Sequence, residues 1–322
     1  MANLKRTATL IFNPYAGFAD WEVHINHVAE FWRGRGWTID IRKTEYPEHA
    51  TELARAAAAA GHRMVLAAGG DGTLHEAANG IIDTQTMLAP LPAGTTNCLT
   101  RDLGLPQPDS GDAHWLVQAS RLLLEGAIHR MDVGQCSNGR HFLLWAGVGL
   151  DSHIVEHVEP RSALLKRLGF AGYFMKPTPY FLNYVGGAIR VTVDSSTVEG
   201  PFVNVIICNS RLYAGGLYNL NPQGALDDGD FEVWAFTGKF PARMFLHSIP
   251  IWLGQHDRKD DILLLRGKHV ILEPAKPVAF YLDGEINRYT PITCTVLPGA
   301  LRILTPTRTP AGLFQHAGER MP

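Results

Sequence analysis

Two hydrophobic periods alternate through the first third of the chain. Apolar runs typical of buried strands occur at Thr7–Phe12 and Met64–Ala68, and the apolar spacing typical of helices occurs at Trp21–Arg33 and Ala50–Ala60. Further strands are predicted at Thr38–Arg42, Met87–Leu91 and Ile128–Val133. Strands that alternate with helices in this way predict a parallel sheet covered by helices on both faces.

The pattern changes near Asp132. From Phe142 onward the chain contains many short β-rich runs, which favour a mostly antiparallel second domain. These runs are Ala188–Val193, Phe202–Cys208, Phe231–Phe236, His269–Glu273, Val278–Leu282, Ile292–Val296 and Leu301–Leu304. The tail, residues 306–322, contains Pro310, Gly312 and Gly318 and is expected to fray.

Composition excludes several function classes. The chain has 322 residues, 46% hydrophobic and 19% charged, which is enough for two domains with their own cores. A formal net charge of −2 creates no general attraction to nucleic acid or to an anionic membrane. The four cysteines form no Cys-x-x-Cys pair, which argues against a disulfide framework or structural zinc and favours a reducing cytoplasm. No apolar stretch approaches the roughly 18 residues of a membrane-spanning helix.

A glycine-rich loop, Gly69-Gly70-Asp71-Gly72-Thr73, joins the strand at Val65–Ala68 to a helical run from Leu74. Glycines let backbone N–H groups approach phosphate oxygens, and the following helix presents its positive N-terminal end. A carboxylate at Asp71 would repel polyphosphate unless a cation lies between them, so the loop also suggests Mg²⁺. The alternative is an ordinary βα turn in which Asp71 caps the helix.

A second loop, Pro92-Ala93-Gly94-Thr95-Thr96-Asn97, follows the strand Met87–Leu91 and again leads into a helix. Two such loops at one sheet edge predict a nucleotide-binding crevice. No Walker motif is present, because Gly238-Lys239 and Gly267-Lys268 lack the upstream glycine and the following Ser or Thr. Zinc-protease and Gly-x-Ser-x-Gly hydrolase motifs are also absent.

These motifs, in order along most of the chain, resemble the diacylglycerol kinase-like lipid kinases, a family that includes diacylglycerol, sphingosine and ceramide kinases. The series begins with Asn13-Pro14-x-Ala16-Gly17, the glycine-rich loop with Glu76, and the second loop. It continues with Asp132-Val-Gly134, Gly147-Val-Gly149-x-Asp151, Asn209, Gly215-Gly216, Asp227-Asp228-Gly229 and Asp283-Gly284-Glu285. The order of the motifs makes the resemblance specific.

The resemblance implies a fold class of α/β plus all-β. Residues 1–132 would form an N-terminal Rossmann-like nucleotide-binding domain, to which a final strand near 300–305 returns. Residues 133–299 would form a C-terminal antiparallel β-sandwich that binds the lipid, with the active site in the cleft between the two domains. ATP would be the phosphate donor and Mg²⁺ the cofactor.

Site residues follow from the same resemblance. The catalytic residues would be Asp283, Glu285 and Asp71. The metal ligands would be Asp71, Asp132, Asp227 and Asp228. The nucleotide-binding residues would be Asn13, Pro14, Gly17, Gly69, Gly70, Asp71, Gly72, Thr73, Glu76, Gly94, Thr95, Thr96 and Asn97.

The catalytic assignment is chemically sensible, because a lipid hydroxyl that attacks the γ-phosphorus needs a proton acceptor. Asp283-Gly284 is also a favoured hairpin turn, and Asp227-Asp228-Gly229 is a favoured turn sequence. The chain departs from the family at Cys98, where many members have Asp, so the acidic network that links Asp71 and Asp132 loses a member. The departure concerns metal coordination rather than the class of reaction.

The segment from Pro160 to Val193 carries five basic residues and no acidic residue, with six aromatic residues between them. Such a basic, aromatic surface suits an anionic leaflet, which makes Arg161, Lys166, Arg167 and Lys176 candidate membrane contacts. The alternative is a pair of core helices whose basic ends reach solvent.

The sequence predicts a cytoplasmic lipid kinase, peripherally associated with the inner membrane face, that phosphorylates the primary hydroxyl of a diacylglycerol, ceramide or sphingoid lipid. One alternative is a kinase of a soluble substrate, chiefly NAD kinase, although the Asn-Glu dipeptide usual in that family is absent. Another is an inactive lipid-binding module. The identity of the lipid and the presence of a homodimer stay open.

Overall fold

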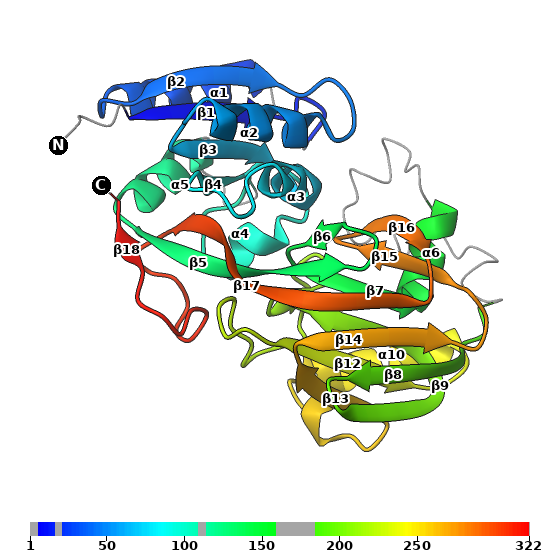
Figure 1. The fold of residues 1–322 in the computed structure, drawn as a ribbon. Coiled ribbons are helices and arrows are strands. Elements are labelled where there is room, and N and C mark those ends of the chain that lie inside the picture. Colours follow the sequence, from blue (N-terminus) through cyan, green and yellow to red (C-terminus); the bar gives the residue numbers. More distant parts are fainter. Residues whose placement is uncertain (1–5, 17–20, 109–113, 159–183, 322) are drawn as a thin grey trace. The chain divides into compact units, whose positions relative to one another are not determined.

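The structure, a computed structural model, describes residues 6–16, 21–108, 114–158 and 184–321. The chain divides into two compact units (Figure 1). Unit 1 comprises Met1–Met131 and Gly299–Pro322, and unit 2 comprises Asp132–Pro298. Among the described helices, none is long and apolar enough to cross a membrane.

Unit 1 is built on a parallel sheet. Its strands are β1 (Thr7–Phe12), β2 (Thr38–Lys43), β3 (Met64–Gly69) and β4 (Met87–Pro92), in the order β4-β3-β1-β2. All residues of β3 and β4 are buried, as expected for central strands covered on both faces. This continuous burial explains why their sequences read as uninterrupted apolar runs.

Helices cover the two faces of this sheet. Helix α1 (Trp21–Arg33) packs with α5 (Trp115–Leu124), and α2 (His49–Ala59) packs with α3 (Asp71–Asn79). A short helix, α4 (Cys98–Asp102), follows the second loop. The α2–α3 approach requires Gly80, because a Cβ there would lie 2.5 Å from the carbonyl oxygen of Thr51.

Two strands run from one unit into the other. Strand β5 (Ala127–Cys136) leaves unit 1, and β17 (Ile292–Thr305) returns to it. The second half of β17 lies parallel to β4, with Ile303 opposite Leu88. Leu301–Leu304 is therefore a strand of the parallel sheet, whereas its β-rich sequence alone grouped it with the antiparallel domain.

The expectation that residues 306–322 fray is wrong for the described part of the tail. Leu313 is fully buried, and the ring of Phe314 stacks on that of His129 with 4.2 Å between centroids. Strand β18 (Glu319–Arg320) pairs antiparallel with the start of β5. Proline and glycine shape this tail into turns, but two apolar side chains and a strand pair hold it against unit 1.

Unit 2 is antiparallel. The order of its main sheet is β16-β15-β7-β9-β8-β14-β17, and β12 pairs with β9 and β13. The strands are β6 (His141–Phe142), β7 (Trp145–Gly149), β8 (Gly187–Val193), β9 (Ser196–Cys208), β10 (Leu212–Tyr213), β11 (Tyr218–Asn219), β12 (Phe231–Thr237), β13 (Ile262–Gly267), β14 (His269–Pro274), β15 (Ala279–Leu282) and β16 (Glu285–Tyr289). The inward residues of these strands, among them Phe142, Phe202, Phe231 and Phe280, form one apolar core.

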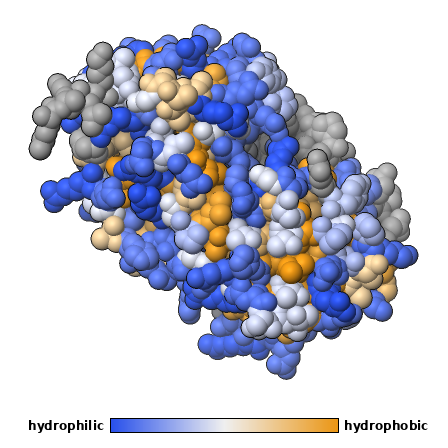
Figure 2. Space-filling view, viewed as in Figure 1, coloured by the Kyte–Doolittle hydropathy of each residue, from blue (hydrophilic) through white to orange (hydrophobic). Residues whose placement is uncertain are grey.

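Three helical segments accompany these strands: α6 (Leu150–Val158), α10 (Pro241–Trp252) and the 3₁₀ turn η2 (His256–Arg258). Figure 2 shows one face of the protein, on which hydrophilic residues predominate and hydrophobic residues form smaller patches. The predicted fold class, an N-terminal parallel sheet with helices and a C-terminal antiparallel sandwich, is confirmed.

Candidate functional site

The glycine-rich loop is the end of β3 and the first turn of α3. Gly70 is the N-cap of α3 in an extended conformation, and Leu74 N donates the first helical hydrogen bond to Gly70 O at 3.1 Å. Gly69 has no room for a side chain, because a Cβ there would lie 2.3 Å from the Cβ of Thr73. The loop thus brings the positive end of a nine-residue helix to the carboxyl edge of the sheet.

The second loop lies directly against the first. A Cβ on Gly94 would lie only 2.3 Å from Gly70 Cα, and Ala93 N donates to Gly69 O at 2.9 Å. Asn97, in a left-handed conformation, accepts from Gly94 N at 2.8 Å and donates to Gly94 O at 2.9 Å. Gly94 is therefore required by the contact between the loops, a reason that sequence reasoning missed.

Asp71 joins these two loops. Its carboxylate accepts hydrogen bonds from the hydroxyl of Thr96 at 3.0 Å, from Cys98 N at 2.9 Å and from Leu99 N at 3.2 Å. Asp71 thus caps α4, not the helix that it begins. Cys98 contributes only its backbone N–H to this contact, and its side chain is buried.

The other predicted nucleotide-binding residues of unit 1 differ in their contacts and in their exposure. Asn13 donates to the Thr73 hydroxyl at 3.4 Å and its own side-chain oxygen accepts from Tyr15 N. Glu76 caps a neighbouring helix, since its carboxylate accepts from Ala50 N at 3.1 Å. Pro14 is half-buried and Thr95 is exposed. Gly17 lies outside the described residues.

Asp283 forms a tight turn in unit 2. Asp283 and Gly284, with φ values of 47° and 92°, are the two-residue connection between β15 and β16, as the hairpin interpretation expected. The buried carboxylate accepts from Leu143 N at 2.7 Å, Leu144 N at 2.9 Å and Trp145 N at 2.9 Å. These three donors come from consecutive residues and hold the carboxylate of Asp283 in one orientation.

Glu285, the other predicted catalytic residue, begins β16 and is exposed. Its carboxylate receives no hydrogen bond from the part of the chain that the structure describes. The structure therefore brings Asp283 into a defined environment and leaves Glu285 in solvent.

The acidic turn Asp227-Asp228-Gly229 lies around Asp132. Asp132 is buried, its N–H donates to Leu226 O at 2.7 Å, and its carboxylate accepts from Gly229 N at 2.6 Å. Asp228 instead pairs with Arg266 at 2.5 Å. Burial raises the pKa of Asp228 above its usual value, against the lowering effect of Arg266.

These carboxylates fit a metal only in part. Asp132 and Asp227 offer the hard oxygen ligands that Mg²⁺ prefers, but Asp228 is paired with Arg266, and the carboxylate of Asp71 accepts hydrogen bonds from the start of α4. Within the described ranges, the metal-ligand grouping of three or more residues that the structure assembles is His153, Glu156 and His157 on α6. The acidic residues thus suit a cation that keeps most of its ligands from phosphate and water, not a closed protein site.

Near the start of α6 lies a half-buried carboxylate, Asp151, to which the sequence assigned no role. Asp151 accepts from the hydroxyl of Tyr213 and from Asn204 Nδ2, and Asn204 is completely buried in β9. Burial raises the pKa of Asp151 from 3.8 to about 6, although the bond from Asn204 opposes this shift. The motif Gly147-Val-Gly149-x-Asp151 marked the position, but no local pattern indicated these distant partners.

The predicted membrane contacts Arg161, Lys166, Arg167 and Lys176 all lie outside the described residues.

Comparisons with known proteins agree over both units. Residues 7–136 match the family model described as diacylglycerol kinase catalytic domain, and residues 145–305 match the model described as YegS C-terminal NAD kinase beta sandwich-like domain. A diacylglycerol kinase from Bacillus subtilis is 26% identical over 89% of this chain and 92% of its own length.

A curated protein of Pseudomonas aeruginosa, named "Probable lipid kinase YegS-like", is 30% identical over 86% of this chain and 88% of its own length. A crystal structure of a diacylglycerol kinase from Bacillus anthracis str. Sterne has a TM-score of 0.70. It is 21% identical and covers 94% of this chain and 98% of that chain, so it shows the shared fold.

Proposed function

The chain belongs to the diacylglycerol kinase-like family of lipid kinases, and from this membership we propose that it transfers the γ-phosphate of ATP to a primary hydroxyl of a membrane lipid. The acceptor class comprises diacylglycerol, ceramide and sphingoid bases, each of which presents such a hydroxyl on an apolar body. The reaction needs a nucleotide site, an acceptor site and a group that takes the hydroxyl proton.

The observation that carries this proposal is the pair of glycine loops in unit 1. They meet with Gly70 against Gly94, and the carboxylate of Asp71 fastens the second loop to the first turn of α3. Backbone without side chains and a helix N-terminus at the edge of a parallel sheet are suited to phosphate groups. Thr95, exposed on the second loop, is available to donate its hydroxyl to the nucleotide.

Asp283 is the proposed proton acceptor. Three backbone N–H groups fix its buried carboxylate in one orientation, which is what a positioned proton acceptor requires. A positioned base of this kind contributes roughly 10²- to 10⁴-fold in rate. Mg²⁺, when bound with the nucleotide near carboxylates such as Asp132 and Asp227, supplies neutralisation of phosphate charge.

The test is direct phosphorylation. The purified protein is incubated with labelled ATP, Mg²⁺ and a membrane lipid extract dispersed in detergent micelles, and the labelled product is identified by mass spectrometry. We expect label in the organic phase as a lipid phosphate. Asp283→Asn should lose this product, and Glu285→Gln is its exposed neighbour for comparison.

A second candidate is a kinase of a soluble nucleotide, which the NAD kinase-like description of residues 145–305 favours. Addition of NAD to the same reaction distinguishes the two, because label would then appear in a water-soluble dinucleotide. Label in neither product, with ATP bound, would leave the inactive lipid-binding module.

A further inference from the structure

Helix α10 has one face that packs on unit 2. Pro241, His247 and Ile251 are buried, and the ring of His247 bonds through Nε2 to Thr237 O at 2.9 Å. The contacts of this face are with strands β9, β11 and β12 and with η2. The inner face is thus an ordinary helix-on-sheet interface.

The opposite face is apolar as well, and it is open. Phe245, Ile249 and Trp252 follow one another at helical spacing and are 65%, 49% and 71% exposed. Leu246 within α10, and Phe240 and Leu253 at its two ends, are also more than half exposed. A helix that is apolar on both faces is normally covered on both, so this surface indicates a partner outside the described chain.

The charged residues of α10 itself, and of the turn just before it, are cations. Between Glu232 and Asp257 the sequence contains no acidic residue, and the cations there are Lys239 and Arg243, at the start of α10. Both are exposed on long side chains that can follow an apolar surface and end at phosphate groups. Arg243 is 3.8 Å from Asp261, a contact loose enough for the guanidinium to exchange partners.

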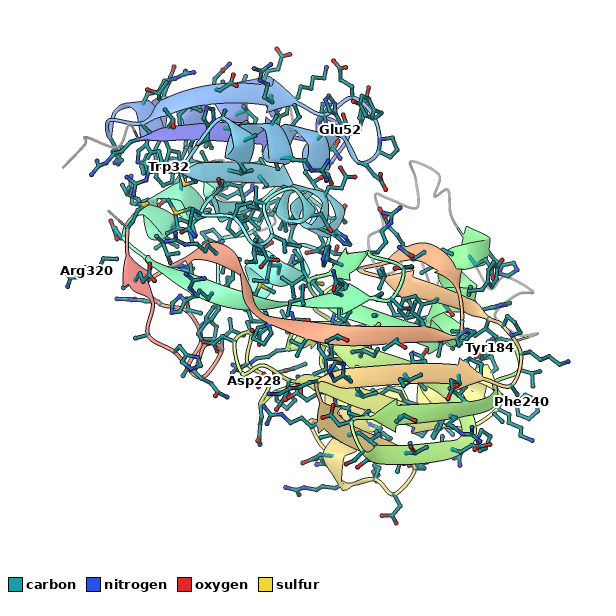
Figure 3. The ribbon with its side chains drawn as sticks, viewed as in Figure 1. Trp32, Glu52, Tyr184, Asp228, Phe240 and Arg320 are labelled. Atoms are coloured by element: carbon teal, nitrogen blue, oxygen red, sulfur yellow. The ribbon has the colours of Figure 1, made fainter. Side chains whose placement is uncertain are left out.

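The start of α10 also lies beside the end of the basic, aromatic segment that the sequence predicted for membrane contact. That segment re-enters the described structure at Tyr184, and Gly186 N donates to Lys239 O at 2.6 Å. Val185 is 61% exposed. Figure 3 shows Tyr184 and Phe240 at the same end of unit 2.

We propose that the open face of α10, together with Phe240, is the surface on which the protein docks on a lipid bilayer. Phe245, Ile249 and Trp252 enter the boundary between headgroups and acyl chains, and Lys239 and Arg243 contact lipid phosphates. Aromatic and aliphatic side chains flanked by cations on the same helix are the composition of interfacial helices, and the nearby carboxylate, Asp261, belongs to the turn before β13. This inference rests on the proposed function in one respect, because a lipid substrate requires contact with a membrane.

The test is binding to vesicles of phosphatidylcholine and phosphatidylglycerol, measured by co-sedimentation without ATP. Phe245→Gln with Trp252→Gln should lower the partition coefficient about 10- to 100-fold, because two large exposed apolar side chains are removed. The matched control is Val23→Gln with Leu264→Gln, two apolar residues that are 50% and 49% exposed elsewhere. This control should bind as the parent does. Absence of vesicle binding by the parent, or equal loss in both pairs, would overturn the proposal.

Trp252 provides a second readout. Among the tryptophans whose burial the structure gives, Trp32, Trp37, Trp115, Trp145 and Trp234 are buried and Trp252 is exposed. Brominated lipids should therefore quench the parent protein, and Trp252→Phe should remove most of that quenching. Unchanged quenching in Trp252→Phe would place the contact elsewhere.

Two further measurements separate this proposal from its premise. Sedimentation velocity should give the same mass for the parent and the double variant; a parent dimer that becomes monomeric would assign the face to a second copy of the chain. Lipid phosphorylation in detergent micelles needs no bilayer, so it tests the kinase alone. Lipid phosphorylation without α10-dependent vesicle binding would overturn the docking surface and leave the proposed kinase activity intact. Vesicle binding that depends on α10, without lipid phosphorylation, would overturn the kinase activity and leave the docking surface intact.

Discussion

Asp71 in unit 1 and Asp283 in unit 2 each accept three hydrogen bonds through the carboxylate, but the groups that donate these bonds differ. Asp71 binds the hydroxyl of Thr96 and two N–H groups of α4, so it fastens one loop to another. Asp283 is buried on a turn with positive φ and binds three consecutive backbone N–H groups. The carboxylate of Asp71 shapes a loop, whereas the carboxylate of Asp283 is itself held in one orientation, as its proposed role as a base requires.

Asp283→Asn should produce the largest effect. We expect a roughly 10²- to 10⁴-fold fall in kcat with the KM for ATP nearly unchanged, because the variant loses basicity at the hydroxyl. The amide has one oxygen for three N–H donors, so the free energy of unfolding should also fall by about 1–3 kcal/mol. Steady-state kinetics and urea unfolding measure the two effects.

Glu285→Gln is a control for the stability effect of Asp283→Asn only, because the Glu285 side chain is exposed and its change should not affect unfolding. Turnover within a few-fold of the parent in folded Asp283→Asn would show that Asp283 only shapes the turn.

The loop side of the comparison is tested by two glycines. In Gly94→Ala the new Cβ would lie 2.3 Å from Gly70 Cα, so the loops are forced apart and ATP affinity should fall about 100-fold, with a loss of about 1–3 kcal/mol in stability. In Gly70→Ala the Cβ would lie 3.4 Å from Gly94 Cα, which the fold tolerates. Calorimetric ATP titration and thermal unfolding measure both variants.

Gly70→Ala tests whether phosphate approaches the loop backbone, because this substitution leaves the contact between the loops in place. Stability close to the parent with weakened ATP binding would indicate that phosphate approaches the backbone at Gly70. Parent-like ATP binding in Gly94→Ala would contradict the assignment of the nucleotide to these loops.

Asp71→Asn should have an intermediate effect. Loss of the charged acceptor weakens the hold on α4, and we expect about a 10-fold lower ATP affinity with a smaller change in kcat. Because the carboxylate is used by Thr96, Cys98 and Leu99, added Mg²⁺ should not restore affinity. Thr96→Val, which removes one of the three bonds, should show part of the defect. Full rescue of Asp71→Asn by Mg²⁺ would make Asp71 a metal ligand instead.

An effect on stability alone is expected at Asp151, in the form of a pH dependence. Burial raises the pKa of its folded form from 3.8 to about 6, so the folded state holds a proton that the unfolded state releases between these values. Stability therefore falls as pH rises through this window, by up to about 2–3 kcal/mol, and is constant above it. Asp151→Asn should lack this component, as measured by the difference between the urea midpoints of the two proteins from pH 4 to pH 7. Parallel profiles would show that Asp151 is solvated like an ordinary carboxylate.

The sequence predicts best where local pattern and tertiary environment agree. The strands at Thr7–Phe12 and Met64–Ala68 are buried on both faces, so their apolar runs had a single interpretation. Helix α10 was missed because it carries apolar residues on both faces and contains Pro250. Strand β13 was missed for a related reason. The burial of Leu263, Leu264 and Leu265 alternates along the strand, but because all three are leucine the sequence shows no alternation of apolar and polar residues.

Contacts between distant residues set the limits of prediction at the candidate site. The sequence pointed to Asp71 and Asp283, but not to the backbone N–H groups that each binds, since those bonds span 27 and about 140 residues. Asp151 gained its raised pKa from burial beside Asn204 and Tyr213, which come from other strands. Residue types at a motif can thus be identified before their environment is known.

The path of β17 has a consequence for how the protein folds during its synthesis on the ribosome. The parallel sheet is begun by the first strands to be synthesised, but the neighbour of β4 on its outer side is a strand at residues 299–305. Until that strand has been made, β4 presents an unpaired edge, which is a template for association with other chains. The parallel sheet of unit 1 therefore cannot be completed in order of translation, and a chain released before β17 has been made would carry an open sheet edge.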